Sequence, residues 1–471
     1  MFEINFSKLK RVHLVGVKGV GMTALAQFLV AQFPHIEFSS SDVADSFLTD
    51  SVLKKIKLSV KSFSAKNISS DIDLVISSGA WYEPKDWKSF SVNKKGEAVY
   101  GKALNDNVDI KEALKQNIPV ITYPQAIGFL SKKYRVIAVA GSHGKSTTTA
   151  MLGFALEKAG KSPSVLVGTR VRKWESSGRV GRSKYLVVEA DEYREAFLNY
   201  KPYGVIVTNI DYDHPDYYKT KASYYRAFKR LISNVDKDGF VVGFGDDMQV
   251  ASLLKFAQGL KLRVGRYGYL GKDDLVLSDD GVFAGKQMFH TVFHAQKRAG
   301  KLSFVGKHMI ANAGAAILAG EFIRANRKGL YDGIATFPGT ARRFEYLKKT
   351  KNEVLIDDYA HHPSEIRATL AGARALYPEK KICAIFQPHM FSRTEKLLAD
   401  FSKAFIDADT VGIMHVYASA REARGDVSSK DLVFGITKQH KDVRLLASFA
   451  EGRKFVKEPR GWLGSNTYGS G

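Results

Sequence analysis

The segment that most constrains the fold is residues 141–147, whose sequence is Gly-Ser-His-Gly-Lys-Ser-Thr. It follows the apolar run RVIAVA and precedes a helical run that ends in FALEKAG. A glycine-rich turn between a strand and a helix presents backbone N–H groups and a helix N-terminus, which form a concave anion site. Lys145 can reach the outer phosphates of a nucleotide, and the Ser146 hydroxyl is placed to bind Mg²⁺. Val139 stands where the common pattern has glycine, so we interpret the loop as a short variant of a triphosphate site; a tight turn with an incidental lysine is the alternative.

Short apolar runs alternate with helical segments along the whole chain. The expected strands lie at residues 12–17, 73–78, 119–123, 135–140, 185–192, 203–214, 353–360, 381–389 and 409–417. This alternation predicts an α/β fold with parallel sheets, which bind ligands at the carboxyl ends of their strands. At about 150 residues per domain, the 471 residues predict three domains, with boundaries near residues 122 and 337.

The composition is that of a globular protein with a large excess of positive charge. Lys and Arg number 71 against 48 Asp and Glu, which gives a net charge of +23. Such a charge favours an anionic partner. The basic residues are spread along the chain without an arginine tract, a zinc finger or an RNP-like motif, so we expect phosphorylated small molecules and no nucleic acid.

The single cysteine, Cys383, excludes a disulfide scaffold and a four-cysteine zinc site. We expect it to be a buried strand residue. No apolar run reaches the ~18 residues of a membrane span, and the first residues lack the apolar stretch of a signal peptide. The sequence therefore predicts a cytoplasmic protein without membrane insertion, and it leaves a monomer and a homodimer open.

A second glycine-bearing turn, formed by Gly16, Gly19 and Gly21, follows the first expected strand. The glycine spacing differs from that of the dinucleotide fingerprint. Asp42 follows at the end of the next expected strand, where an acid can accept a hydrogen bond from a ribose hydroxyl. We interpret the turn as a pyrophosphate site, and a purely structural turn is the alternative.

Two acidic motifs follow strands of the central segment. They comprise Glu189, Asp191 and Glu192 in the first motif, and Asn209, Asp213, His214 and Asp216 in the second. Hard oxygen ligands with one imidazole suit Mg²⁺ held between the protein and phosphate oxygens. Solvated acidic loops are the alternative.

Polar and cationic residues also gather after the expected strands of the third segment. The motifs are Arg-Arg-Phe-Glu at 342–345, Asp-Asp-Tyr-Ala-His-His-Pro at 357–363 and Gln-Pro-His-Met-Phe-Ser-Arg at 387–393. Such groups fit the binding of a γ-phosphate or a carboxylate. Because adjacent residues point in different directions, we do not expect His361 and His362 to form a two-histidine metal site. A surface hydrogen-bond network is the alternative for any one of these residues.

In their order and spacing, five of these motifs resemble those of the Mur ligases. They are GSHGKSTTT, EADE, TNIDYDHPDYY, RRFE and DDYAHHPSEI, and the resemblance extends from about residue 11 to about residue 450. It implies a Rossmann-like UDP-sugar domain at 1–121, a P-loop-type ATP domain with a mostly parallel sheet at 122–336, and a Rossmann-like α/β domain at 337–471. The opening GVKGVGMTALA points within the family to the members that add L-alanine.

The resemblance also implies roles for individual residues. ATP would be bound by Gly141, Ser142, His143, Gly144, Lys145, Ser146, Thr147, Asn312, Arg343 and Asp358. Mg²⁺ would be held by Ser146, Glu189 and His214. The UDP-sugar would be bound by Gly16, Gly19, Gly21, Asp42, Ser77 and Ser78, and the amino acid by Tyr359, His361, His389 and Arg393. The catalytic set would be Lys145, Glu189, His214, Arg343 and His361.

The implied reaction activates a lactyl carboxylate of UDP-N-acetylmuramate with ATP. The acyl phosphate would then be attacked by the amine of L-alanine, with ADP and phosphate as the other products. Alternatives are ligation of a recovered tripeptide to the same UDP-sugar, and a nucleotide-binding module without ligase activity. A nicotinamide dehydrogenase would leave the phosphate loop unused.

The chain departs from the family pattern in two places. Met390 stands where the family often has arginine, which puts the choice of amino acid in doubt. The C-terminal residues 458–471 lack the family's Gly-Ala-Gly-Asp turn, and suitable codons read one base later could spell a matching strand. We therefore expect a frameshift near residue 458, poor order beyond it and a third domain without its last strand.

Overall fold

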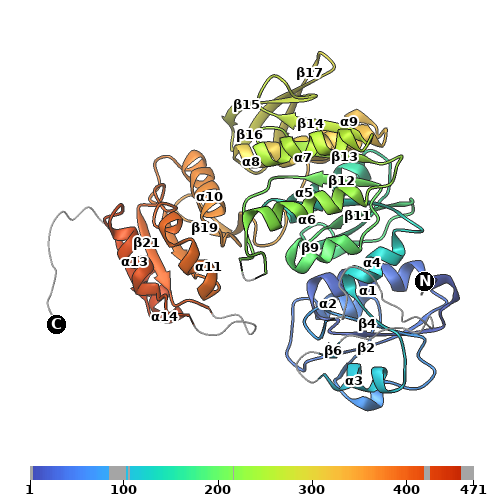
Figure 1. Cartoon of the computed structure of the whole chain (residues 1–471). Coiled ribbons are helices and arrows are strands. Elements are labelled where there is room, and N and C mark those ends of the chain that lie inside the picture. The colour runs from blue at the N-terminus through green and yellow to red at the C-terminus, as the bar shows by residue number, and fades with distance from the viewer. Residues whose placement is uncertain (1–3, 84–101, 104–106, 216, 418–424, 458–471) are drawn as a thin grey trace. The chain divides into compact units, whose positions relative to one another are not determined.

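The computed structural model describes residues 4–83, 102–103, 107–215, 217–417 and 425–457. These form two compact units, residues 1–359 and 360–471, which we describe separately (Figure 1). The three-domain boundaries at 122 and 337 stay predictions. Asp216 and the C-terminal residues 458–471, with the expected frameshift and missing strand, lie outside the described residues.

The first unit begins with a five-stranded parallel sheet in the order β3-β2-β1-β4-β7. Its strands are β1 (Arg11–Val15), β2 (Glu37–Asp42), β3 (Val60–Ser62), β4 (Leu74–Ser77) and β7 (Val120–Thr122). The accompanying helices are α1 (Val20–Gln32), α2 (Asp50–Lys55), α3 (Val108–Lys115) and α4 (Tyr123–Leu130). A short hairpin pairs β5 (Tyr82–Glu83) with β6 (Lys102–Ala103). The strand order is Rossmann-like, as predicted.

A ten-stranded sheet follows in the same unit, in the order β10-β9-β11-β8-β12-β13-β14-β15-β16-β17. Its strands are β8 (Arg135–Ala140), β9 (Ser164–Val171), β10 (Ser176–Arg179), β11 (Tyr185–Glu189), β12 (Gly204–Val207), β13 (Phe240–Phe244), β14 (Arg263–Gly268), β15 (Leu275–Phe283), β16 (Lys286–Phe293) and β17 (Gln296–Leu302). The sheet is parallel from β9 to β15, and β10, β16 and β17 pair antiparallel at its ends.

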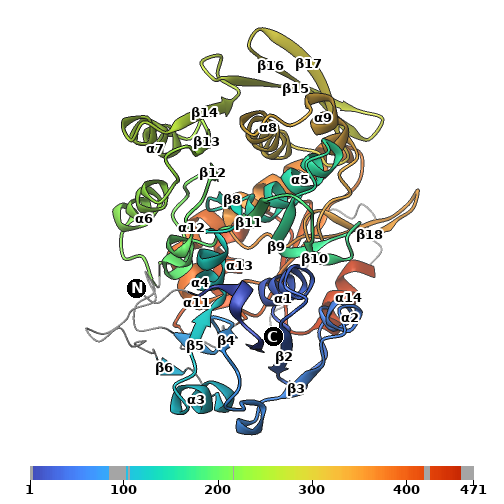
Figure 2. The same ribbon diagram turned by 90° about the vertical axis from the view of Figure 1, so that its right-hand side faces the viewer.

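Helices cover both faces of this sheet (Figure 2). One face carries α5 (Lys145–Lys158), α8 (Lys307–Phe322) and α9 (Arg327–Ala335), and the other carries α6 (Lys221–Ser233) and α7 (Met248–Gly259). In β8, Val136 and Ala138 belong to one core cluster while Ile137 and Val139 belong to the other. Because successive side chains of a strand point to opposite faces, a continuous apolar run such as RVIAVA forms a strand buried on both sides. The unit ends in an antiparallel hairpin of β18 (Glu345–Lys349) and β19 (Val354–Asp357).

The second unit contains a three-stranded parallel sheet, β20 (Cys383–Phe386), β21 (Thr410–Met414) and β22 (Val443–Leu446). Its helices are α10 (Pro363–Leu376), α11 (Phe391–Lys396), α12 (Leu398–Phe401), α13 (Ser429–Thr437) and α14 (Phe449–Lys457). Cys383 lies in a strand as predicted, but it is exposed, so the prediction that it is buried was wrong. It begins β20, which is an edge strand of this sheet. None of the helices in the described ranges has the length and apolar character needed to cross a membrane.

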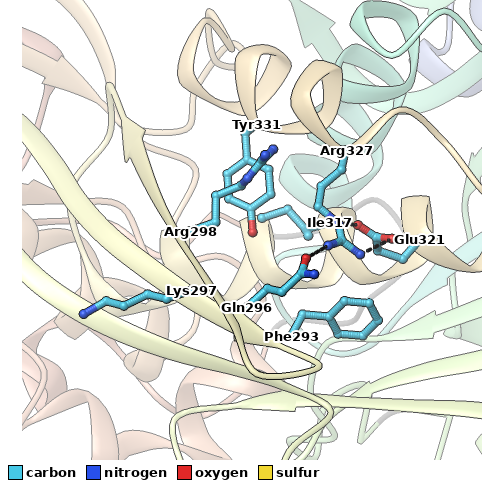
Figure 3. A pocket seen from close by; sticks show the side chains of 8 residues that line it. All are labelled: Phe293, Gln296, Lys297, Arg298, Ile317, Glu321, Arg327 and Tyr331. Atoms are coloured by element: carbon cyan, nitrogen blue, oxygen red, sulfur yellow. Dashed lines mark hydrogen bonds and ion pairs between the residues drawn. The ribbon is translucent and has the colours of Figure 1, made fainter.

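A cavity of about 350 Å³ lies between the β16–β17 hairpin and helices α8 and α9 (Figure 3). Arg327 donates to both carboxylate oxygens of Glu321, at 2.5 and 3.0 Å, and to the side chain of Gln296 at 2.8 Å. The Lys297 side chain points away from this group, and the Arg298 guanidinium lies over the Tyr331 ring at 5.2 Å. The Glu321 carboxylate thus already neutralises the Arg327 guanidinium in this cavity.

A buried polar cluster lies within the N-terminal sheet. The ring nitrogens of His13 lie 2.7 Å from the Ser39 hydroxyl and 3.0 Å from the Ser41 hydroxyl. Asp109 is fully buried, accepts a hydrogen bond from the Ser64 N–H at 2.7 Å, and lies 3.9 Å from His13. Burial alone would raise the pKa of the Asp109 carboxyl, but hydrogen bonds from His13 and its neighbours lower that pKa below its usual value.

We predict that Asp109→Ala lowers the free energy of unfolding by about 1–3 kcal/mol at pH 7, because the half-buried Ser64 N–H loses its acceptor. A carboxyl group with a lowered pKa in the folded state stabilises the protein above its unfolded pKa, and this contribution is lost as the pH falls. The difference in unfolding free energy between wild type and Asp109→Ala should therefore shrink below about pH 4.

Urea unfolding monitored by circular dichroism measures this difference. The matched control is Asp238→Ala, because Asp238 is exposed and should change the unfolding free energy by less than about 0.5 kcal/mol. Equal effects of the two substitutions would contradict the role given to Asp109.

Candidate active site

The loop between β8 and α5 depends on two glycines. Gly141 and Gly144 have φ angles of 132° and 80°, in the region that favours glycine. A Cβ atom on Gly141 would lie 2.1 Å from the Thr208 hydroxyl, and one on Gly144 would lie 2.7 Å from the side-chain oxygen of Asn312. The loop can therefore approach both side chains only because it has glycine at these positions.

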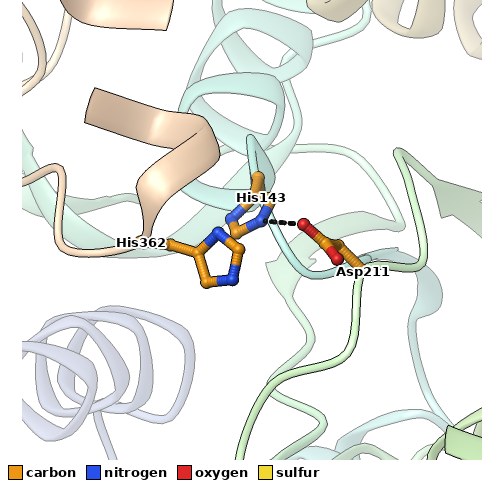
Figure 4. A group of neighbouring side chains, drawn as sticks. All are labelled: His143, Asp211 and His362. Carbon is orange, nitrogen blue, oxygen red and sulfur yellow. Dashed lines mark hydrogen bonds and ion pairs between the residues drawn. The ribbon is translucent and has the colours of Figure 1, made fainter. Parts of the chain in front are cut away.

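Thr208 and Asn209, which follow β12, hold the loop in place. The Asn209 side chain accepts the backbone N–H of His143 at 2.9 Å and donates to its carbonyl at 3.1 Å. The Thr208 hydroxyl donates to the same carbonyl at 2.6 Å. The ring of His143 also lies 3.3 Å from Asp211 (Figure 4). The sequence motif groups Asn209 with the candidate Mg²⁺ ligands, but in the structure its amide positions the loop.

Lys145 folds back across the loop. Its ammonium donates to the carbonyls of Gly141 at 2.6 Å and Ser142 at 3.1 Å, and to Glu192 at 3.0 Å. Burial alone would lower the pKa of Lys145, but the neighbouring carboxylates, Glu192 above all, raise it. The side chain is thus a fixed positive charge at the mouth of the anion site.

Ser146 and Glu189 form a pair beside this lysine. The Ser146 hydroxyl donates to Glu189 at 3.0 Å, and the other Glu189 oxygen accepts the Gly168 N–H at 2.6 Å. A Cβ atom on Gly168 would lie 2.8 Å from that oxygen, so glycine there leaves room for the carboxylate. A hydroxyl and a carboxylate side by side are hard oxygen donors of the kind that Mg²⁺ takes in phosphate sites, so these two residues fit the ion.

His214 lies beside Glu192. Its Nε2 lies 3.4 Å from Glu192 and 3.8 Å from Asp213, and its ring packs against Tyr193. Burial alone would lower the pKa of His214, but the hydrogen bond to Glu192 and the charge of Asp213 raise it. The imidazole of His214 lies near the last two acids of the first motif, Asp191 and Glu192. One potential ligand atom from each of the three residues lies within 4.8 Å of the others.

Asn312 reaches the loop from α8. Its side-chain oxygen accepts the Thr148 hydroxyl at 3.1 Å and lies against Gly144, and Asn312 itself is 7% exposed. Thr147 lies at the start of α5 and is also buried. The structure thus brings Asn312 to the loop, as the resemblance implies.

The N-terminal glycine turn joins β1 to α1. Gly16 has a φ of 74°, and a Cβ atom there would lie 2.6 Å from the Trp81 ring and 2.9 Å from Ser78. Both Asp42 carboxylate oxygens accept backbone N–H groups, from Lys18 at 2.6 Å and Val43 at 2.7 Å. Asp42 therefore shapes the turn itself, in addition to any role it has toward a ribose.

The other residues expected at the sugar nucleotide lie close to this turn. Ser77 is buried at the end of β4, and the backbone N–H of Ser78 donates to Val15 of β1 at 2.9 Å. Gly19 precedes α1, and a Cβ atom on Gly21 would lie 3.6 Å from the Tyr123 ring.

The last residues of the first unit bring three predicted positions together. The guanidinium of Arg343 lies over the Tyr359 ring at 5.3 Å, and the Asp358 carboxylate accepts the Phe344 N–H at 2.7 Å. The Ala341 carbonyl accepts the Thr169 hydroxyl at 3.0 Å. Thr169 follows Gly168, so this segment is tied to the strand that contacts Glu189.

In the second unit, the predicted residues follow strand ends or begin helices. His361 precedes α10, and its N–H donates to Glu365 at 3.0 Å. His389 follows β20 and stacks on Tyr417, with 5.7 Å between ring centroids. Arg393 is 5% exposed in α11, which follows Met390 in a left-handed conformation with φ of 73°.

Sequence reasoning missed several residues of the loop's surroundings. It did not single out Thr208, Asp211 or Tyr224, and it assigned no role to Glu192 beyond the acidic motif. The Tyr224 hydroxyl lies 2.8 Å from that of Ser142, although the two residues are 82 positions apart. Among these residues, only Glu192 had a sequence feature that pointed to the site, namely its place in an acidic motif after a strand.

Two family models match the chain. The Mur ligase middle domain matches residues 139–320, and the Mur ligase, glutamate ligase domain matches residues 342–457. A UDP-N-acetylmuramate–L-alanine ligase of Caldanaerobacter subterraneus subsp. tengcongensis is 36% identical over 97% of this chain and 94% of its own length. A ligase of the same name from Desulfitobacterium hafniense is 36% identical over 95% of this chain and 94% of its own.

Solved structures agree with these matches. A UDP-N-acetylmuramate–alanine ligase of Thermotoga maritima superposes with a TM-score of 0.74 at 26% identity, covering 95% of this chain and 92% of that one. A murein peptide ligase of Psychrobacter arcticus shares the fold, with a TM-score of 0.65 at 21% identity and the same coverage of 95% and 92%. The identity to curated ligases over nearly the whole chain shows that this protein belongs to the Mur ligase family.

Proposed function

We propose that this chain joins L-alanine to the lactyl carboxylate of UDP-N-acetylmuramate, with ATP as the energy source, for the synthesis of peptidoglycan precursors. The observation that carries the proposal is the loop that sets Lys145 and Ser146 beside Glu189, in a chain that aligns over nearly its full length with ligases of that activity. Since ATP and a UDP-linked sugar are the substrates, we place the reaction in the cytoplasm.

The chemistry has to bring a carboxylate to the γ-phosphate, and both groups are anions. Lys145 lies at the mouth of the anion site, where its ammonium can neutralise developing charge on the phosphate oxygens. Ser146 and Glu189 would hold Mg²⁺, which supplies further neutralisation, and His214 is the third proposed ligand. Arg343 is the second side chain that we propose to neutralise charge on the phosphate oxygens. The acyl phosphate is then attacked by the amine, which gives the amide and inorganic phosphate.

The remaining assignments are also proposals. The turn of Gly16, Gly19 and Gly21 binds the diphosphate of the UDP-sugar, with Asp42, Ser77 and Ser78 near the nucleoside. Asn312 and Asp358 contact ATP, and Tyr359, His361, His389 and Arg393 bind the amino acid. The three domains at 1–121, 122–336 and 337–471 carry the UDP-sugar, ATP and amino-acid sites respectively.

The proposal predicts phosphate release that requires UDP-N-acetylmuramate, ATP and an amino acid together, with L-alanine the best substrate in a panel of amino acids. A coupled phosphate assay with product identification by mass spectrometry measures this. Faster phosphate release with the L-alanyl-γ-D-glutamyl-diaminopimelate tripeptide would support the alternative, ligation of a tripeptide to the same UDP-sugar. Met390, which stands where the family often has arginine, favours this alternative. Binding of both nucleotides without turnover would support the nucleotide-binding module.

We predict that Lys145→Ala lowers kcat by at least two orders of magnitude and leaves the Kd for UDP-N-acetylmuramate within about twofold of wild type. Loss of one positioned charge costs on the order of 3 kcal/mol in the transition state. The sugar nucleotide is assigned to a separate sheet. Stopped-assay kinetics and calorimetry measure the two effects, and Lys158→Ala, at an exposed position of the same helix, is the control. A parallel loss of UDP-sugar affinity in Lys145→Ala would overturn the two-site assignment.

We predict that Glu189→Gln raises the Mg²⁺ concentration for half-maximal activity on the order of tenfold or more, because a neutral amide is a poorer ligand for a hard cation. Titration of Mg²⁺ into metal-depleted enzyme at saturating ATP tests this. Glu157→Gln is the matched control, since Glu157 pairs with Arg179 at 3.1 Å on α5. An unchanged Mg²⁺ requirement in the Glu189 variant would contradict the ligand role.

A further inference from the structure

Glu192 is a buried carboxylate that joins two functional side chains. It is 0% exposed, although it lies in a loop after a strand. Its carboxylate oxygens lie 2.9 and 3.0 Å from the Lys145 ammonium and 3.4 Å from Nε2 of His214. A buried carboxylate is costly unless it is paired, so these two partners account for its presence here.

The arrangement uses all the donors of the lysine. An ammonium group has three N–H donors, and those of Lys145 point to the carbonyls of Gly141 and Ser142 and to Glu192. Of these acceptors only Glu192 carries a full negative charge. A phosphate oxygen that binds Lys145 must therefore compete with Glu192 for the ammonium.

The backbone around Glu192 is also fixed. Its carbonyl accepts the Tyr218 hydroxyl at 2.5 Å, and its carboxylate lies 3.4 Å from the Tyr224 hydroxyl. Tyr218 N–H in turn donates to the carbonyl of His214, which has a positive φ of 54°. Tyr218 thus contacts both residues, Glu192 through its hydroxyl and His214 through its backbone N–H.

We propose that Glu192 is a positioning residue, which holds the Lys145 ammonium and the His214 imidazole at a fixed separation and aims both at the nucleotide's phosphates. It competes with those phosphates for Lys145, so its charge weakens ATP binding while it improves alignment for phosphoryl transfer. The proposal rests on the function given above, since that function places a triphosphate at this loop.

The test is Glu192→Gln, with Glu192→Asp as a second variant. In Glu192→Gln, kcat should fall about tenfold or more while KM for ATP falls, because alignment is lost together with the competing charge. Glu192→Asp keeps the charge on a shorter side chain, so it should lower kcat without the gain in ATP binding. The control Glu195→Gln removes a nearby carboxylate that pairs with Arg230 at 2.6 Å, outside the loop, and should leave both constants unchanged.

Direct binding of the non-hydrolysable analogue AMP-PNP with Mg²⁺, measured by calorimetry, separates this proposal from the proposed function. The affinity of Glu192→Gln for AMP-PNP should exceed that of wild type, and an equal affinity would contradict the competition at Lys145. If the wild-type protein binds AMP-PNP but releases no phosphate, the proposed ligase function is wrong. The comparison of AMP-PNP affinities still tests the competition between Glu192 and the phosphates for Lys145. Weaker AMP-PNP binding in Glu192→Gln, or a rise in KM with a lower melting temperature, would reduce Glu192 to a structural residue and overturn the proposal. An unchanged kcat would overturn it as well.

Discussion

The close approach of the loop after β8 to its neighbours is the constraint on which the site depends. Gly141 touches Thr208 at the end of β12, and Gly144 touches Asn312 of α8. These two contacts connect a strand on one side of β8 with a helix that covers one face of the sheet. A side chain at either glycine would push the loop off Thr208 and Asn209, and Lys145 and Ser146 would then no longer face Glu189 and Glu192. The chemistry therefore rests on two positions that lack a side chain.

Charge is distributed around this loop in a definite order. Lys145 is surrounded by carboxylates, while Ser146 and His214 each contact one of them. Glu189 ends β11 and Glu192 follows in the next loop, so the end of this strand brings both carboxylates to the site. The excess of positive charge is a property of the whole chain, whereas this site gathers carboxylates around the half-buried Lys145. Net charge thus indicated an anionic partner without locating its site.

Much of the fold was predictable from the sequence because buried parallel strands have a simple signature. The expected strands at 135–140 and 203–214 contain β8 and the shorter β12, and the turn at 141–144 lies where the pattern placed it. Contacts between distant residues were not predictable, since spacing along the chain does not report them. Asn209 looked like a metal ligand and holds the loop instead, and Asp42 looked like a ribose ligand and also holds its own turn. Cys383 has a strand sequence around it, but whether a strand lies at the edge of a sheet depends on the assembled sheet.

The first helix shares its core with the central sheet. Ser176 of β10 bonds to Gln27 of α1 at 2.6 Å, Ser177 donates to the carbonyl of Val20 at 3.0 Å, and a single apolar cluster runs from Leu25 through Val136 to Phe228. Val20 lies between Gly19 and Gly21 of the turn assigned to the sugar nucleotide. The turn before α1 and the loop after β8 therefore adjoin elements that share one hydrophobic core. A substitution that loosens this core would therefore disturb both glycine turns together, although the turns lie far apart in the sequence.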